Sequence, residues 1–262
     1  MILTAENYYT READLEYMSV SQYKGFMRCE AAALATIKRE WAQPMSTALL
    51  VGSYVDAHFE GTLEQFKENH PELFKRDGTL KADYKQAEEI IQVLEDDPVF
   101  MKYMGGEKQV IRTAKLFGVP WKIKIDADHD DMIVDLKIMR SMERVMGRSF
   151  VEHWGYDIQM AVYQAVSAAA GYPREETHLA VGTKQTPPDK EIVEIPPWRR
   201  NECLEEVEKN LPRIMAVKRG EVEARRCGTC DYCRATKKLK MPLDFELVGL
   251  SNAELVALMG TS

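Results

Sequence analysis

Long apolar runs are missing from this sequence: no stretch approaches the roughly 18 residues that a transmembrane helix needs. Residues 1–7 also lack the basic start and the apolar stretch of a signal peptide. No internal repeat or low-complexity tract is visible. We therefore expect a cytoplasmic protein with no membrane partner.

An excess of positive charge is missing too. The chain has 35 Lys and Arg residues against 42 Asp and Glu residues, which gives a net charge of −7. This balance argues against a protein that coats nucleic acid with a broad basic surface. It is compatible with an enzyme that holds DNA in a local basic groove around acidic metal ligands, because such ligands themselves make the net charge negative.

Cysteine is scarce, and its distribution is uneven. The five cysteines are Cys29, Cys203, Cys227, Cys230 and Cys233. An odd number in a cytoplasmic protein argues against a disulfide framework. The last three lie close together in the sequence, which indicates a metal or cluster site.

The composition is otherwise that of a globular protein. Hydrophobic residues make up 45% of the 262 residues, enough for a sizeable core in one large domain or two small ones. Residues 1–105 are predicted to be mainly helical. The expected helices run from Ser19 or Ser21 to about Trp41, from Ser46 (after the breaker Pro44) through Val51, Val55 and Phe59, and over residues 63–74 and 82–103.

The pattern changes after Gly106. Alternating segments rich in β-branched residues predict strands at 108–117, 121–126 and 132–139, joined by turns at 118–120 and 126–131. A helix at 150–170, strands at 177–183 and 191–195, a helix at 198–218 and a short helical tail after Ser251 are expected to follow. This order predicts an α/β fold with a mixed central β-sheet flanked by helices, after an N-terminal helical region.

The hairpin at 121–139 carries a distinctive acidic group. Asp135 and Lys137 share one face of the third strand, because side chains two residues apart point to the same side. The residues on the other face are apolar and are expected to be buried. If the preceding turn is tight, Asp126 lies opposite Asp135, and two carboxylates and an ammonium group converge.

Such a group suits phosphodiester hydrolysis. Two carboxylates can hold Mg²⁺, which prefers oxygen ligands, polarises the phosphoryl group and lowers the pKa of the attacking water. A lysine beside the ion can orient that water or offset the charge of the transition state. The same pattern also fits a solvated strand face with a cross-strand ion pair, so the hairpin alone leaves both interpretations open.

These residues resemble the PD-(D/E)xK nucleases, and the likeness extends along most of the chain. The segments that carry it are YMSVSQYK (17–24), GSYVDAHFEG (52–61), KID (124–126), IVDLK (133–137) and YDIQMAVY (156–163). The branch that they resemble contains RecE-type exodeoxyribonuclease VIII and phage exonucleases, and is related more distantly to the RecB nuclease domain. The resemblance implies a restriction-endonuclease-like core in a single nuclease domain, 1–262. Its parts would be a mainly helical region (1–105), the catalytic sheet and helices (106–220) and a Cys-rich segment with a C-terminal tail (221–262).

The resemblance also implies roles for the site residues. Asp126 and Asp135 would be metal ligands, and Lys137 would be the catalytic lysine. Gln159 and Tyr163 match the Gln-x-x-x-Tyr helix motif of the RecB-like branch, which would touch the metal site or the DNA backbone. Ordinary helix packing is the alternative for that pair.

The chain departs from the family pattern in several places. Ile125 replaces the motif's proline, which matters little because the carboxylate does the chemistry. Asp56 stands where the RecB-like branch often has a histidine ligand, and an aspartate there would favour Mg²⁺ over softer ions. His58 is expected to be a packed or partly exposed helix residue. Relatives often carry a glutamate on the first strand; Gln109 or Glu107 lies nearby, and that ligand is left open.

The late cysteines form a Cys-x2-Cys-x2-Cys pattern. Some RecB-like nucleases, of the AddB type and certain CRISPR-associated exonucleases, hold a [4Fe–4S] cluster with one early and three late cysteines. By this resemblance Cys29, Cys227, Cys230 and Cys233 would bind a cluster that pins the C-terminus to the N-terminal helices, although the late spacing is tighter here. Zinc on the same thiols and free thiols are the alternatives. Cys203 is expected to be a half-buried helix residue.

The candidates for contacts with DNA phosphates are Lys24, Arg28, Arg140, Arg144, Lys184 and the pairs Arg225-Arg226 and Lys237-Lys238. The favoured function is a Mg²⁺- or Mn²⁺-dependent exonuclease that acts on duplex DNA ends in phage-type recombination. A single-strand annealing recombinase is an expected partner, and a homo-oligomer is expected from RecE-type relatives. An endonuclease of the same fold, and a non-catalytic DNA-binding or structural member, are the alternatives.

Overall fold

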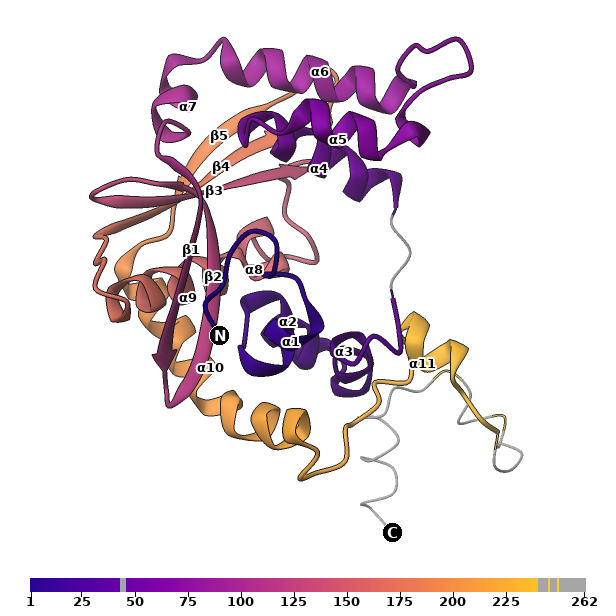
Figure 1. Cartoon of the computed structure of the whole chain (residues 1–262), viewed down its shortest axis with the longest axis vertical. Coiled ribbons are helices and arrows are strands. Elements are labelled where there is room, and N and C mark those ends of the chain that lie inside the picture. The colour runs from indigo at the N-terminus through magenta and orange to yellow at the C-terminus, as the bar shows by residue number, and fades with distance from the viewer. Residues whose placement is uncertain (43–45, 240–244, 246–248, 250–262) are drawn as a thin grey trace. The chain divides into compact units, whose positions relative to one another are not determined.

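The computed structural model describes residues 1–42, 46–239, 245 and 249 (Figure 1). The predicted helix breaker Pro44 and the helical tail predicted after Ser251 lie outside the described residues. The chain divides into two compact units. Unit 1 comprises Met1–Ala5 and Pro44–Val207, and unit 2 comprises Glu6–Gln43 and Glu208–Ser262. Unit 2 is therefore assembled from two stretches that are far apart in the sequence.

Unit 1 contains a five-stranded sheet in which the strand order follows the chain. Strands β3 and β4 are parallel, and all other neighbours are antiparallel. The sheet is thus mixed, as predicted, and its strands lie close to the predicted ranges. They are β1 (Glu107–Leu116), β2 (Val119–Asp128), β3 (Met132–Met139), β4 (Glu176–Thr183) and β5 (Lys190–Glu194).

The sheet divides between β2 and β3. Strand β2 pairs with β1 along nearly its whole length, but with β3 only through Ala127↔Val134 and Asp128↔Ile133. Strand β3 continues beside β4. Figure 1 shows the β1–β2 hairpin running in a different direction from β3, β4 and β5. We call the opening that this leaves between the two strands the β2–β3 fork; Asp126 and Asp135 stand at its start.

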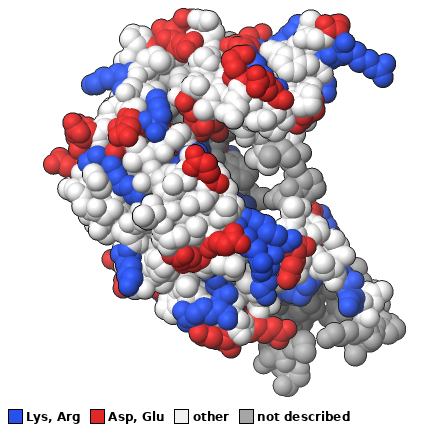
Figure 2. Space-filling view, in the orientation of Figure 1, with Lys and Arg blue, Asp and Glu red and all other residues white. Residues whose placement is uncertain are grey.

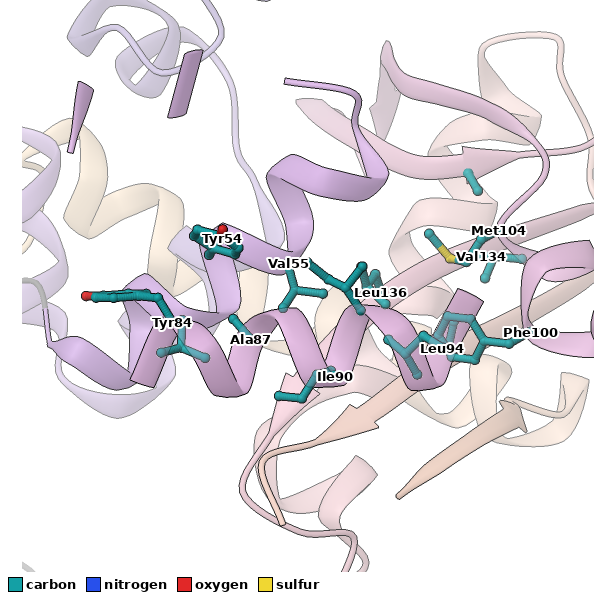
Figure 3. Packing of buried hydrophobic residues seen from close by; sticks show 14 of the residues in the cluster. Tyr54, Val55, Tyr84, Ala87, Ile90, Leu94, Phe100, Met104, Val134 and Leu136 are labelled. Carbon is teal, nitrogen blue, oxygen red and sulfur yellow. The ribbon is translucent and has the colours of Figure 1, made fainter. Parts of the chain in front are cut away.

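Helices cover both faces of the sheet. On one face, α4 (Thr47–Phe59), α6 (Ala82–Glu95) and α7 (Pro98–Tyr103) form a core with Val134 and Leu136 of β3 (Figure 3). Burial of aliphatic and aromatic side chains of this size stabilises a fold by about 1.5–3 kcal/mol each. On the other face, α9 (Tyr156–Ala169) packs against β1 and β2. Because side chains alternate along a strand, Asp135 points toward α9.

Three predicted helices of unit 1 are interrupted, each for a local reason. In 82–103, the side chain of Asp97 accepts from the N–H groups of Val99 and Phe100 and starts α7 afresh, with Pro98 in its first turn. In 150–170, α8 (Phe150–Trp154) ends at Gly155, which adopts a left-handed φ of 63°. Residues 63–74 form α5 (Leu63–Asn69) and a 3₁₀ turn, η1 (Pro71–Leu73). Ser46 caps α4, as predicted.

Unit 2 consists of helices and connecting segments over its described residues. They are α1 (Arg11–Glu16), α2 (Val20–Arg28), α3 (Glu30–Ile37), α11 (Asp231–Ala235) and the second half of α10 (Pro197–Arg219), which begins in unit 1. The prediction of one helix from Ser19 or Ser21 to Trp41 is wrong. Ser19 caps α2, but Cys29 is extended (φ −162°, ψ 107°) and separates α2 from α3. Within the described residues, no helix is both long and apolar enough to cross a bilayer.

Candidate active site and thiol cluster

Asp126 lies in the β2–β3 fork. Its Oδ2 accepts a hydrogen bond from the backbone N–H of Leu136 on β3 (2.9 Å), and its Oδ1 accepts one from the side-chain amide of Gln109 on β1 (3.3 Å). Gln109 has a positive φ of 56°, which is uncommon for a residue with a Cβ atom. The Asp126 carboxylate is therefore held from both neighbouring strands at the point where the regular ladder ends.

Asp135 is the most buried of the acidic residues here, with 2% of its surface exposed. Its Oδ1 accepts a hydrogen bond from Gln159 Nε2 on α9 (2.7 Å), and its Oδ2 forms an ion pair with Lys137. Lys137 Nζ also donates to the Leu136 carbonyl (3.1 Å) and lies 5.3 Å from the centroid of the Tyr156 ring. The structure thus brings together Asp135, Lys137 and Gln159, which the sequence singled out on two separate elements.

Asp56 lies on α4 and is partly buried. With Glu60, Gln109 and Asp126 it lines a small cavity of ≈ 10 Å³, about the space that one water molecule occupies. Burial and the neighbouring carboxylates of Asp135 and Glu60 raise the pKa of Asp56 to about 7, although Lys137 opposes this shift. The residue that replaces the expected histidine therefore does lie beside the predicted metal ligands.

The carboxylates of this site repel one another, and this repulsion shifts their pKa values. Burial, followed by repulsion from Asp135, raises the pKa of Asp126 well above its usual value. Burial alone would lower the pKa of Lys137, but attraction to Asp135, Asp126 and Asp56 outweighs it and keeps this pKa raised, so the ammonium stays charged. Three carboxyl groups thus lie near one partly exposed ammonium group, and either protons or a divalent cation can compensate their excess negative charge.

The donor set fits a hard divalent cation. Asp56, Asp126 and Asp135 offer only oxygen ligands, which Mg²⁺ and Mn²⁺ prefer. Among the described residues, Asp135 Oδ2 is buried and has no hydrogen-bond donor beyond its ion pair with Lys137. A carboxylate oxygen has two lone pairs, so Asp135 Oδ2 can keep its ion pair with Lys137 and still bind a divalent cation.

The other predicted residues lie outside this group or in unit 2. Tyr163 follows one turn after Gln159 on α9 and is partly buried, and Arg140 directly follows β3 and is exposed. Lys24 and Arg28 belong to α2 in unit 2. His58 forms an ion pair with Glu95 on α6 (2.8 Å) and is partly buried, as predicted for a packed helix histidine.

Two contacts of the site were not predicted from the sequence. Gln109 was considered only as the place of a missing acidic ligand, but its amide donates to Asp126. Tyr156 was not singled out, although it precedes Gln159 by three residues, a spacing that places two side chains on one helix face. That spacing was the available signal for the contact between Tyr156 and Lys137.

The four predicted cluster ligands of unit 2 converge. The sulfur atoms of Cys29, Cys227, Cys230 and Cys233 all lie within 4.8 Å of one another. The distance from Cys29 Sγ to Cys233 Sγ is 3.6 Å, and that from Cys227 Sγ to Cys233 Sγ is 3.9 Å. Cys203, on α10, lies in unit 1 and is fully rather than half buried.

Backbone N–H groups point at the sulfur atoms. The N–H of Cys230 donates to Cys227 Sγ (3.4 Å), and that of Cys233 donates to Cys230 Sγ (3.5 Å). Burial acts to raise the pKa of the Cys227 thiol, but hydrogen bonds from the backbone of Cys230 and Thr229 lower it to about 6. The thiolate is the form that binds metals, so this loop favours the metal-binding state of one ligand before any ion arrives.

The model of a protein family described as "PDDEXK-like domain of unknown function (DUF3799)" matches residues 19–236. The chain belongs to this family. A crystal structure from Eubacterium rectale, described as a "putative exonuclease", is 48% identical to this PDDEXK-like chain. The match covers 95% of this chain and 99% of that chain, with a TM-score of 0.91.

A second solved structure, named SSO0001, is 15% identical over 84% of this chain and 98% of that chain, with a TM-score of only 0.30. No curated protein matches this chain. The family and the E. rectale structure confirm membership of the PD-(D/E)xK superfamily. Together with the mixed sheet and its flanking helices, they confirm the restriction-endonuclease-like α/β fold. The RecE-type branch stays a prediction.

Proposed function

We propose that this PDDEXK-like protein is a deoxyribonuclease that hydrolyses phosphodiester bonds with Asp126, Asp135 and Lys137 at its active site. The observation that carries the proposal is the buried ion pair of Asp135 and Lys137 next to Asp126 in the β2–β3 fork. A purely structural role gives little reason to gather three carboxyl groups near one ammonium group, because burial of the carboxyl groups penalises each negative charge. A site that binds a divalent cation and a phosphodiester needs all of them.

Asp56, Asp126 and Asp135 would hold the Mg²⁺ or Mn²⁺ ion. When bound, the ion would polarise the phosphoryl group and lower the pKa of the attacking water. Gln159 is a positioning residue in this scheme, because its amide fixes Oδ1 of Asp135 while Oδ2 faces Lys137.

Lys137 stays protonated, since its pKa is raised, so it would act as a cation rather than as a base. Its ammonium can orient the attacking water or offset the charge on the phosphoryl oxygens in the transition state. Tyr163, and the Tyr156 ring beside Lys137, are proposed to border the substrate.

We further propose an exonuclease that acts on duplex DNA ends, as in the RecE-type branch, with a role in phage-type recombination. The description of the E. rectale protein as a "putative exonuclease" supports this choice over an endonuclease. A single-strand annealing recombinase as partner, a homo-oligomer, and the treatment of residues 1–262 as one nuclease domain belong to the same proposal. Lys24, Arg28 and Arg140 are proposed to contact DNA.

The test compares linear and closed circular duplex DNA, each incubated with the wild-type chain and Mg²⁺ and with Asp135→Ala and Lys137→Ala. We expect only linear DNA to be degraded, and both variants and EDTA to abolish the activity. Cleavage of closed circles would instead support an endonuclease. Absence of metal-dependent activity on either DNA would support a non-catalytic DNA-binding or structural protein.

We also propose that Cys29, Cys227, Cys230 and Cys233 hold a metal centre, either a [4Fe–4S] cluster or a zinc ion. A tetrahedral zinc with Zn–S distances of about 2.3 Å places its sulfur ligands about 3.8 Å apart, close to the 3.6 and 3.9 Å found here. An iron–sulfur cube is larger and requires the thiols to move apart. A brown anaerobic preparation that absorbs at about 400 nm would support the [4Fe–4S] cluster. One equivalent of zinc in a colourless protein supports the ion, and neither metal by elemental analysis rejects both.

A further inference from the structure

A basic groove lies next to the thiol cluster, entirely within unit 2. It has a volume of ≈ 640 Å³, and its lining includes Arg28, Glu30, Lys209, Arg213, Arg225 and Arg226. Five of these six residues are basic in a chain whose net charge is −7. On the face that Figure 2 shows, acidic and basic side chains are interspersed. The groove lining therefore carries an excess of positive charge, although the chain as a whole is acidic.

The one acidic residue named in this groove, Glu30, neutralises Arg213 and leaves the other basic residues in excess. The carboxylate of Glu30 accepts from Arg213 Nε (2.7 Å) and Nη2 (2.8 Å) and from the backbone N–H of Arg225 (2.7 Å). It is thus fully engaged with groups of the groove wall. The side chains of Arg28 and Lys209 are exposed, and neither forms an ion pair with another described residue. Their charges remain available to an anion in the groove.

The thiol cluster and the groove share their framework. Cys29 directly follows Arg28 and Cys227 follows the two arginines at 225–226, and both cysteines also line the groove. The Arg225 carbonyl accepts from the Ala31 N–H (3.1 Å) and from Cys29 Sγ (3.9 Å). A metal bound to these cysteines would therefore also restrain the backbone of the neighbouring arginines.

We propose that this groove binds the phosphate backbone of DNA. Its lining comes from α2–α3, from α10 and from 225–227, and the thiol centre holds the first and last of these segments together. The inference rests on the proposed nuclease function and adds a DNA contact surface to it. Arginine and lysine side chains suit phosphate oxygens. The groove also contains the apolar side chains of Met27 and Ile214, against which a sugar or a base can pack, as in other grooves that follow a nucleic-acid strand. A small inorganic anion would need neither a groove of this volume nor the apolar side chains of Met27 and Ile214.

The test measures DNA binding separately from cleavage. The full-length Asp135→Asn chain, which should not cleave, is titrated with fluorescein-labelled linear duplex DNA at several NaCl concentrations in a buffer without divalent metal. In this background, Arg28→Gln and Lys209→Gln are combined. We expect a several-fold rise in Kd. The slope of log K against log salt should become shallower by about 1.8, because two phosphate contacts are lost.

A matched control removes the same charge elsewhere in unit 2. Arg11→Gln and Lys38→Gln remove two exposed positive charges outside the groove lining, and neither residue forms an ion pair with another described residue. We expect this double variant to bind DNA as the parent does. Circular dichroism and metal content of both double variants should equal those of the parent, since all four side chains lie at the surface.

The outcomes separate this inference from the proposed function. If the wild type cleaves DNA and the Asp135→Asn parent binds it, but the groove variant keeps the parent's Kd and salt slope, the groove proposal alone is wrong. An equal loss of affinity in the control would also overturn it, because net charge rather than the groove would then explain binding. If the parent binds no DNA and the wild type cleaves none, both proposals fall.

Discussion

At the scale of single residues, the geometry of the site depends on neutral side chains that orient its carboxylates by hydrogen bonds. Gln159 and Gln109 are both amides, and each donates to one carboxylate of the predicted metal site. An amide is neutral, so it can orient a carboxylate without competing with the cation for its charge. The carboxylates are thereby oriented before an ion binds, which lowers the free-energy cost of binding it.

Replacing Gln159 by alanine should lower nuclease activity by about ten- to a hundredfold, the usual effect of losing a group that orients a metal ligand. The Mg²⁺ concentration needed for half-maximal activity should rise as well, because Asp135 loses the donor that fixes its Oδ1. The matched control is Gln164→Ala on the same helix, whose amide donates to the carbonyls of Arg174 and Glu175 instead. Equal loss of activity in both variants would mean that the helix, not the contact, is responsible.

Metal binding should depend on pH. Asp56 has a pKa of about 7 in the metal-free chain, and that of Asp126 is raised too. Both must lose their protons to bind a cation, so the affinity for Mg²⁺ should increase through pH 7, about tenfold per pH unit for each proton released. Calorimetric titration in buffers of different ionisation enthalpy counts these protons. The Asp56→Asn variant should release fewer protons when it binds Mg²⁺. An affinity for Mg²⁺ that does not change between pH 6 and pH 8 would contradict the prediction.

The raised pKa of Asp56 also predicts how the stability of the metal-free fold changes with pH. A carboxyl whose folded-state pKa is raised favours folding below its ordinary pKa of 3.8, and this contribution is lost as the pH rises through about 7. The metal-free chain should therefore become less stable from pH 5 to pH 8 on account of Asp56. Saturating Mg²⁺ should remove this loss.

At the scale of elements, Asp128 joins three parts of unit 1. It is the last residue of β2 and accepts from Arg112 of β1 and from Arg174, which follows α9; the Arg174 contacts measure 3.1 and 2.9 Å. Burial acts to raise the pKa of Asp128, but these two guanidinium groups outweigh it and lower the pKa. The contact ties the end of the β1–β2 hairpin to the helix layer beneath it.

Asp128→Ala should lower the free energy of unfolding by about 3–5 kcal/mol, because it leaves buried guanidinium groups without their partner. Urea denaturation at neutral pH measures the change. Asp130→Ala is the control: this exposed residue lies in the following turn, and its loss should have little effect. A similar midpoint for both variants would show that the arginines find other partners.

Element ends show how far the sequence could predict this fold. Strand ranges were predicted well, because alternation extends over many residues in each strand. The interruptions at Cys29, Asp97 and Gly155 were missed, although Asp97-Pro98 carried a recognisable capping signal. Alternation also placed Asp135 and Lys137 correctly. The contacts of Gln109 and Tyr156 could not be predicted, because they depend on the β2–β3 fork and on how α9 packs against it.

At the scale of the whole molecule, the thiol cluster joins distant parts of the sequence. Cys29 and Cys233 are separated by 204 positions. Cys233→Ser should lose the bound metal, lower the Tm and expose residues 221–239 to proteolysis, because the segment loses its attachment to α2 and α3. Cys203→Ala in unit 1 is the control and should keep its metal. Full metal content in Cys233→Ser would contradict the assignment of the four ligands.

Because unit 2 is built from two separate stretches of the chain, the two units cannot fold at the same time during synthesis. The first stretch of unit 2, 6–43, leaves the ribosome early, but the residues that complete it begin at 208. The strands and helices of unit 1 are synthesised in between and can fold first, since domains generally form as they emerge. Cys29 must meanwhile remain a reduced thiol without its three partners. The thiol cluster can form only after residue 233 has been made, so a chain truncated after residue 207 would carry the acidic site but not the groove.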